Sequence, residues 1–137
     1  MVNDLRVLVI DDEDMIRDVI KTVLTGAGYQ VSEAADGSIG LKILESESFD
    51  LVITDILMPE KEGIETIMEI KRTYPDLRIV AISGGGRGSY LFPLKIADTI
   101  GAERCLPKPF EPEDLLNAVR EATSGGAADP QVQGSGA

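Results

Sequence analysis

The stretch Asp50-Leu51-Val52-Ile53-Thr54-Asp55 decides the fold of this chain. Its apolar and β-branched middle is typical of a buried strand. Asp55 is the last residue of the run, and Ile56-Leu57-Met58-Pro59 follows at once. A carboxylate at this position lies at the edge of a sheet, where the strand ends and a turn begins. We therefore expect Asp55 to be exposed there and able to react.

The same kind of short apolar run recurs along the chain and alternates with helical patterns. Four further strands are predicted, at residues 5–10, 30–34, 77–82 and 103–106. Apolar residues at helical spacing predict helices at residues 15–24, 39–44, 64–71 and 111–123, and a short helix follows Pro93 at residues 94–100. This order predicts a flavodoxin-like α/β fold, which is a doubly wound, five-stranded parallel sheet in the order 2-1-3-4-5 with helices on both faces.

Length and composition limit the class of protein. A chain of 137 residues is long enough for one domain and too short for two ordinary ones. We expect the domain to span residues 4–123 and the tail at 124–137, which has almost nothing to bury, to be disordered. No apolar run approaches the roughly 20 residues that span a bilayer, no secretion signal is visible, and the single Cys105 excludes an internal disulfide. These features favour a cytoplasmic protein that does not enter membranes.

The charge balance excludes further classes. The formal net charge is −11, whereas a nucleic-acid-binding face needs a surplus of lysine and arginine. We therefore expect no nucleic-acid partner. The chain contains no histidine, which excludes histidine metal ligands, histidine general bases and a phosphohistidine formed on this chain. Any phosphohistidine in its chemistry must come from a partner.

Residues with chemical potential stand at the ends of four predicted strands. They are Asp11 with Asp12, Asp55, Ser83 and Lys108. Taken singly, each has an ordinary structural explanation, because acidic residues favour helix starts, and aspartate, serine and lysine are common in solvated turns. Taken together, three carboxylates at one crevice repel each other unless a cation lies among them. Oxygen ligands of this kind suit Mg²⁺, and Mn²⁺ can substitute for it.

This set of residues fits phosphoryl transfer. That reaction needs a nucleophile in line with the phosphorus, a metal ion and a lysine that neutralise charge, and a hydroxyl donor. Asp55 is the candidate nucleophile and would form an acyl phosphate. Ser83 supplies the hydroxyl group and Lys108 the ammonium group.

Four motifs carry a resemblance to a known family. They are Val7-Leu8-Val9-Ile10-Asp11-Asp12-Glu13, Asp55-Ile56-Leu57-Met58-Pro59-Glu60-Lys61-Glu62-Gly63, Ser83, and Lys108-Pro109-Phe110. In order and spacing the chain resembles the receiver domain of two-component response regulators over residues 4 to about 123. The resemblance implies that Asp55 accepts phosphate from a sensor histidine kinase or a histidine phosphotransfer protein, and that the chain then switches conformation to signal to a downstream protein.

The resemblance also implies a role for each site residue. Asp12, Asp55 and the Leu57 backbone carbonyl would bind Mg²⁺ directly, and Asp11 would act through water. Ser83 and Lys108 would contact the phosphoryl oxygens, and the Lys108-Pro109 bond would be cis.

Two departures from the family pattern concern the conformational switch. Cys105 stands three residues before Lys108, where receivers usually carry an aromatic residue that turns inward after phosphorylation. Ser83 is followed by a glycine-rich stretch, 84–93, that includes Tyr90 and Phe92. Our hypothesis is that this stretch is the mobile element and that Tyr90 or Phe92 replaces the missing aromatic residue. The alternative is that both aromatic residues are ordinary core.

Three functions follow from these patterns. The first is a stand-alone phosphoacceptor receiver, which is an enzyme only in the formal sense that it phosphorylates and dephosphorylates itself. The second is a pseudo-receiver that binds partners without phosphate, which the unusual Cys105 allows. The third is a Mg²⁺-dependent hydrolase of the dehalogenase type. That class needs a second aspartate two residues after the nucleophile, where this chain has Leu57.

Overall fold

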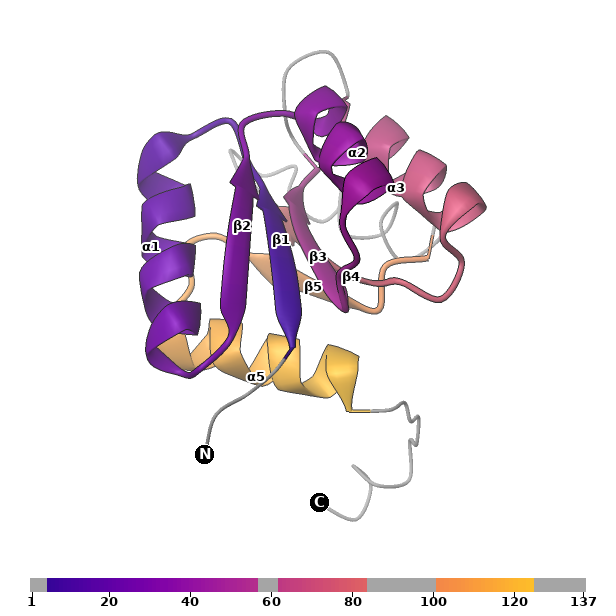
Figure 1. Cartoon of the computed structure of the whole chain (residues 1–137). Helices are drawn as coiled ribbons and strands as arrows, with labels where there is room; N and C mark the ends of the chain where they lie inside the picture. The colour runs from indigo at the N-terminus through magenta and orange to yellow at the C-terminus, as the bar shows by residue number, and fades with distance from the viewer. Residues whose placement is uncertain (1–4, 57–61, 84–100, 125–137) are drawn as a thin grey trace.

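The computed structural model describes residues 5–56, 62–83 and 101–124, apart from the side chains of residues 62, 63 and 83. In this part of the chain one parallel sheet forms the centre, with its strands in the order β2-β1-β3-β4-β5 (Figure 1). This order and the parallel pairing confirm the predicted fold. The strands are β1 Arg6–Ile10, β2 Gln30–Ala34, β3 Leu51–Asp55, β4 Arg78–Ser83 and β5 Arg104–Pro107.

Helices cover both faces of the sheet. The described helices are α1 Asp14–Gly26, α2 Gly37–Ser46, α3 Glu62–Thr73 and α5 Pro112–Thr123. Helices α1 and α5 lie against one face, and α2 and α3 lie against the other (Figure 1). The glycine-rich stretch at 84–93, the short helix predicted at 94–100 and the tail after Ser124 lie outside the described residues.

Alternation along the central strands divides the core into two clusters. Val7 and Val9 of β1 face α1 and α5, whereas Leu8 and Ile10 face α2 and α3. All four side chains are fully buried. Because successive side chains of a strand point to opposite faces, a run that is apolar at every position is buried on both sides. This double burial is the physical reason that the short apolar runs predicted the sheet.

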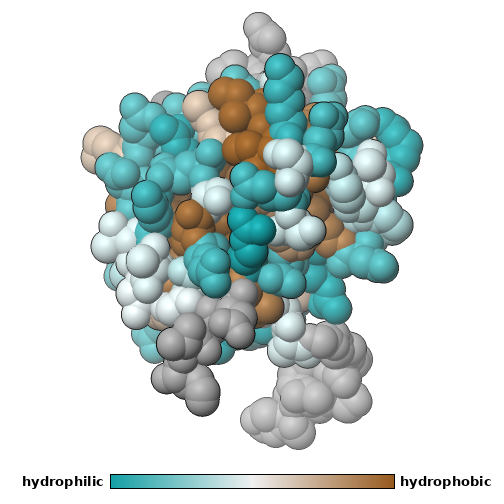
Figure 2. All heavy atoms as spheres, in the orientation of Figure 1, coloured by the Kyte–Doolittle hydropathy of each residue, from teal (hydrophilic) through white to brown (hydrophobic). Residues whose placement is uncertain are grey.

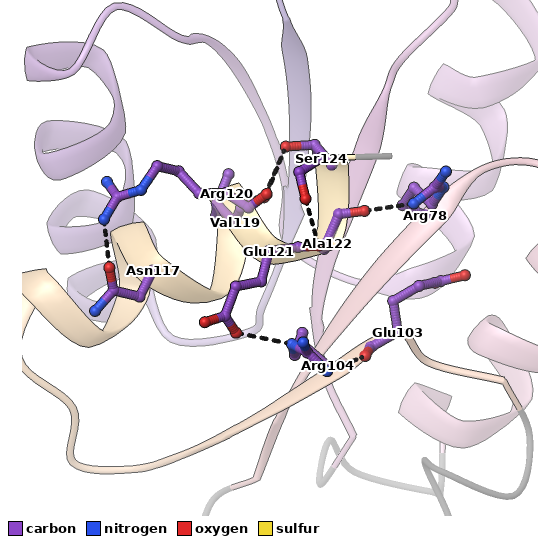
Figure 3. A network of polar contacts seen from close by, with 10 residues as sticks. Arg78, Glu103, Arg104, Asn117, Val119, Arg120, Glu121, Ala122 and Ser124 are labelled. Carbon is purple, nitrogen blue, oxygen red and sulfur yellow. Dashed lines mark hydrogen bonds and ion pairs between the residues drawn. The ribbon is translucent and has the colours of Figure 1, made fainter. Parts of the chain in front are cut away.

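Contacts from β4 and β5 hold α5 in place (Figure 3). The Nη1 atom of Arg78 donates a hydrogen bond to the Ala122 carbonyl at 2.7 Å, and Arg104 Nε lies 2.9 Å from Glu121 Oε1. The second pair is exposed and contributes at most about 1 kcal/mol. Full burial of Leu115 contributes more, about 1.5–3 kcal/mol. Apolar packing therefore provides most of the stability, and the polar contacts set the position of α5 beside β5.

The surface is mixed rather than dominated by one apolar patch. Hydrophilic side chains cover most of the face drawn in Figure 2, with hydrophobic ones between them. Among the described residues, the exposed large hydrophobic ones lie on three different helices: Met15 and Val19 on α1, Ile39 on α2, and Met68 on α3. Within the described ranges, no helix combines the length and the apolar character that crossing a membrane requires.

Two helical glycines have different surroundings. A Cβ atom added to Gly40 of α2 would lie 2.5 Å from Ile10 Cδ1 and 2.9 Å from Ile10 Cγ1, whereas one added to Gly26 of α1 would meet nothing within 4 Å. Ile10 is fully buried and has little room to move. The absence of a side chain at Gly40 therefore allows α2 to pack closely on β1.

This difference predicts opposite effects of the same substitution. Gly26→Ala should raise the free energy of unfolding by up to about 1 kcal/mol, because alanine favours the helix. Gly40→Ala should lower it by about 1–2 kcal/mol, because overpacking at Ile10 exceeds the gain in helix propensity. Urea denaturation of both variants measures the difference. Equal stabilisation by the two substitutions would contradict the close approach of α2 and β1.

Candidate functional site

Strand register brings two aspartates together at the carboxyl edge of the sheet. Ile10 of β1 pairs with Thr54 of β3, so the residues that follow, Asp11 and Asp55, are adjacent across the two strands. By the alternation of side chains along a strand, Asp11 continues the face of Val7 and Val9, and Asp55 the face of Ile53, which is the face covered by α1 and α5. Asp12 follows on the loop to α1. One carboxylate oxygen from each of the three aspartates lies within 4.8 Å of the other two.

Lys108 lies over this carboxylate cluster. Its Nζ atom is 3.2 Å from Asp55 Oδ2, 3.2 Å from Glu13 Oε1 and 3.6 Å from Asp11 Oδ2. Burial alone lowers the pKa of Lys108, but Asp55, Asp11 and Glu13 more than offset this effect, and the net result is a raised pKa. The ammonium group is therefore charged at neutral pH. The Lys108-Pro109 bond is cis, as the resemblance implied.

The carboxyl group of Asp11 is held in an unfavourable environment. Asp11 is fully buried, and its pKa is raised to about 6: burial is the main cause, the charges of Asp55 and Asp12 add to it, and the Glu13 backbone N–H and Lys108 oppose it. Its Oδ1 atom accepts a hydrogen bond from the Glu13 N–H at 2.9 Å, but its buried Oδ2 atom has no hydrogen-bond partner among the described residues. Buried oxygens without a partner are rare in proteins and mark sites of strain or of ion binding.

These observations fit a hard divalent cation. Carboxylate oxygens are the ligands that Mg²⁺ and Mn²⁺ prefer, and the donors here are oxygens from Asp11, Asp12 and Asp55. The Oδ2 atom of Asp11, which accepts no hydrogen bond from the described residues, adds a further acceptor at the same place. The residues present can therefore hold the metal ion that the sequence implied.

The exposure predicted for Asp55 is wrong. The residue is only 3% exposed. Asp55 belongs to the central strand β3, which is flanked by β1 and β4, and Lys108 lies 3.2 Å from its Oδ2 atom. A strand end in the middle of a sheet is therefore enclosed by its neighbours.

The other predicted site residues are described only in part. Ser83 is the last residue of β4, and its backbone pairs with Pro107, directly before Lys108. Its side chain, together with Leu57, Tyr90 and Phe92, lies outside the described residues. Cys105 is partly buried and packs against the cluster of apolar residues that faces α2 and α3.

Sequence reasoning missed two residues of the site. Arg17 of α1 donates from Nη1 to the Asp11 carbonyl at 2.7 Å and from Nε to Glu33 Oε1 at 3.2 Å, so it fixes the loop that carries the acidic residues. Glu13 pairs with Lys108. The sequence held a signal for Glu13, because it is the third acidic residue in a row after Ile10. Its partner lies 95 positions away and cannot be read from spacing.

The fold and the site together define a class of protein. The family model for the response regulator receiver domain matches residues 7–120. The chain is 33% identical over 119 residues to the chemotaxis protein CheY of Thermotoga maritima, which covers 86% of this chain and 97% of CheY. The chain belongs to the response regulator receiver domain family of two-component signalling, whose members are signalling modules.

Similar segments also occur inside longer proteins. The chain is 34% identical over 116 residues to the transcriptional regulator NtrC of Azospirillum brasilense and 34% identical over 117 residues to the sensor kinase CckA of Brucella abortus. These matches cover 85% and 84% of this chain, but only 24% of NtrC and 12% of CckA. The chain therefore corresponds to one segment of these relatives and to nearly the whole of CheY.

Solved structures show the same fold. A response regulator receiver domain protein from Clostridium thermocellum has a TM-score of 0.80 and 35% identity, and it covers 88% of this chain and 95% of its own. A CheY-like receiver domain protein from Methanospirillum hungatei has a TM-score of 0.79 and 29% identity, with 90% and 96% covered.

The environment of Asp11 predicts that removing its charge stabilises the metal-free protein. At pH 8 with EDTA, Asp11→Asn should raise the free energy of unfolding by about 1–3 kcal/mol, because the ionised carboxylate is disfavoured in the folded state. Because the pKa of Asp11 is raised from 3.8 to about 6 in the folded protein, its ionised carboxylate destabilises the fold fully above about pH 6. Below pH 3.8 the group is protonated in both states and this destabilisation is absent. The gain should therefore vanish as the pH falls below that value.

Chemical denaturation at several pH values measures this effect. Asp18→Asn, which removes an exposed charge from α1, is the matched control and should change stability little. A loss of stability in Asp11→Asn at pH 8 would contradict the electrostatic explanation.

Proposed function

We propose that this receiver accepts a phosphoryl group on Asp55 from a phosphohistidine of a sensor histidine kinase or a histidine phosphotransfer protein in the cytoplasm, and then signals to a protein partner. The observation that carries this proposal is the gathering of Asp11, Asp12, Asp55 and Lys108 at one edge of the sheet. The receiver-like segment of the sensor kinase CckA is consistent with a kinase as the donor.

The chain's own residues have defined roles in the transfer. A carboxylate oxygen of Asp55 attacks the phosphorus atom, the phosphorus–nitrogen bond of the donor breaks, and the imidazole retains the bonding electron pair. Lys108 exchanges its contact with Asp55 Oδ2 for one with a phosphoryl oxygen and so stabilises the charge on the transferred group. The buried position of Asp55 limits access of water to the acyl phosphate.

The proposed metal ligands follow from the cluster. Asp12, Asp55 and the Leu57 backbone carbonyl would hold Mg²⁺ or Mn²⁺ directly, and Asp11 would act through water. When bound, the ion neutralises charge on the phosphoryl oxygens and on the carboxylates. The Oδ2 atom of Asp11 supports this role, because it accepts no hydrogen bond within the described residues and could accept one from water.

Ser83 and three further residues are proposed to transmit the signal. Ile82 pairs with Asp55, so Ser83 lies one residue further towards the same edge of the sheet. Its hydroxyl group is proposed to contact a phosphoryl oxygen. Cys105, which pairs with Ala81 of β4, is the switch candidate within the described residues, and Tyr90 and Phe92 are the candidates outside them.

The function predicts phosphorylation at a single aspartate. With acetyl phosphate and Mg²⁺, the intact mass of the native chain should rise by one phosphoryl group, and EDTA should prevent the gain. Asp55→Asn should show no gain under the same conditions, because an amide cannot form the acyl phosphate.

Asp76→Asn provides the matched control, because Asp76 is exposed and lies beside the amino end of β4, away from the carboxyl edge. It should gain the phosphoryl group like the native chain. An unmodified native chain would favour the pseudo-receiver alternative, and modification of Asp55→Asn would place the acceptor elsewhere.

A further inference from the structure

Glu13 directly precedes helix α1, and its side chain is placed unusually for that position. It is the N-cap residue of α1, yet its side chain makes no capping hydrogen bond. Its Oε1 atom instead lies 3.2 Å from Lys108 Nζ. Serine, threonine, aspartate and asparagine cap helices well, whereas the longer glutamate side chain reaches across the crevice. The negative charge of Glu13 is favourable at a helix start, but capping does not use its side chain, which contacts Lys108 instead.

The position of Lys108 explains why one oxygen of the site accepts no hydrogen bond from the described residues. The ammonium group is equally close to Glu13 and Asp55, at 3.2 Å, but it stays 3.6 Å from Asp11 Oδ2. That last distance is still an ion pair but is beyond a hydrogen bond, and within the described ranges the Oδ2 atom has no hydrogen-bond partner. The ammonium group of Lys108 therefore lies closer to exposed Glu13 than to the Oδ2 atom of fully buried Asp11.

We propose that Glu13 is a positioning residue that holds the Lys108 ammonium group away from Asp11 Oδ2, which keeps this oxygen available to a divalent cation or its bound water. The inference rests on the metal-dependent function proposed above. A lysine that closed fully on Asp11 and Asp55 would neutralise the carboxylates that attract the ion and would compete with it. Glu13 offers the ammonium group an alternative partner at the rim of the crevice.

The magnitude of the effect is modest but measurable. The Glu13 side chain is 60% exposed, and ion pairs with an exposed partner are weak. A small bias is sufficient, because a shift of a few tenths of an ångström would bring Lys108 Nζ within hydrogen-bond distance of Asp11 Oδ2. We expect Glu13→Gln to weaken Mg²⁺ binding by about threefold to fivefold, which corresponds to the upper range for such pairs.

Isothermal titration calorimetry with MgCl₂ on the full chain measures this change. Asp18→Asn removes the same charge from an exposed position of α1 and reports the general loss of negative potential. It should weaken binding less than Glu13→Gln does. Equal dissociation constants for the native chain and Glu13→Gln would overturn the inference.

A double-mutant cycle with Lys108→Met separates positioning from charge. Lys108→Met alone should tighten Mg²⁺ binding, because the competing cation is removed. In that background Glu13→Gln should have no more effect than Asp18→Asn, because there is no ammonium group to position. An equally large effect of Glu13→Gln in both backgrounds would show that only its charge matters and would overturn the inference.

A second variant separates metal binding from helix stability. Glu13→Ser supplies a favourable N-cap and should raise the melting temperature of the metal-free protein, while it weakens Mg²⁺ binding as Glu13→Gln does. Parallel losses of stability and metal affinity would indicate a merely structural role for Glu13. A native chain that does not bind Mg²⁺ would overturn the proposed metal site and this inference together, whereas normal binding in both Glu13 variants would overturn this inference alone.

Discussion

The pairing of β1 with β3 is the constraint on which the site depends. Their register places Asp11 beside Asp55, with exposures of 0% and 3%. Two carboxylates in such an environment repel each other and lose most of their hydration, which is unfavourable unless a positive charge lies close by. Lys108, in the loop directly after β5, supplies one such charge at the same edge of the sheet.

The rest of the fold compensates for this unfavourable site. Apolar clusters on both faces of the sheet bury the central strands completely, and this burial stabilises the domain far from its carboxyl edge. The net free energy of unfolding of a domain is small, so the free-energy cost of burying one charged carboxylate is a significant fraction of it. The same buried charge makes the edge receptive to a cation, which connects the stability of the metal-free protein to its proposed chemistry.

The relatives show that this unit occurs in different settings. It corresponds to nearly all of CheY and to a small part of NtrC and CckA. A module used in this way needs a site that is complete within one domain. In the described residues, the acidic cluster and its lysine come from one sheet edge, between β1, β3 and the loop after β5, and therefore require no second domain.

The sequence by itself determined the elements, their order and the residues at the strand ends. Runs such as Val7–Ile10 are apolar at every position, a pattern typical of a strand that is covered on both faces. Aspartates that follow parallel strands of this kind meet at one edge of the sheet. Only the tertiary structure decided that Asp55 is enclosed, that Asp11 Oδ2 accepts no hydrogen bond from the described residues, and that Glu13 binds Lys108. Periodicity reports local burial, whereas these three features depend on distances between segments far apart in the chain, which packing alone sets.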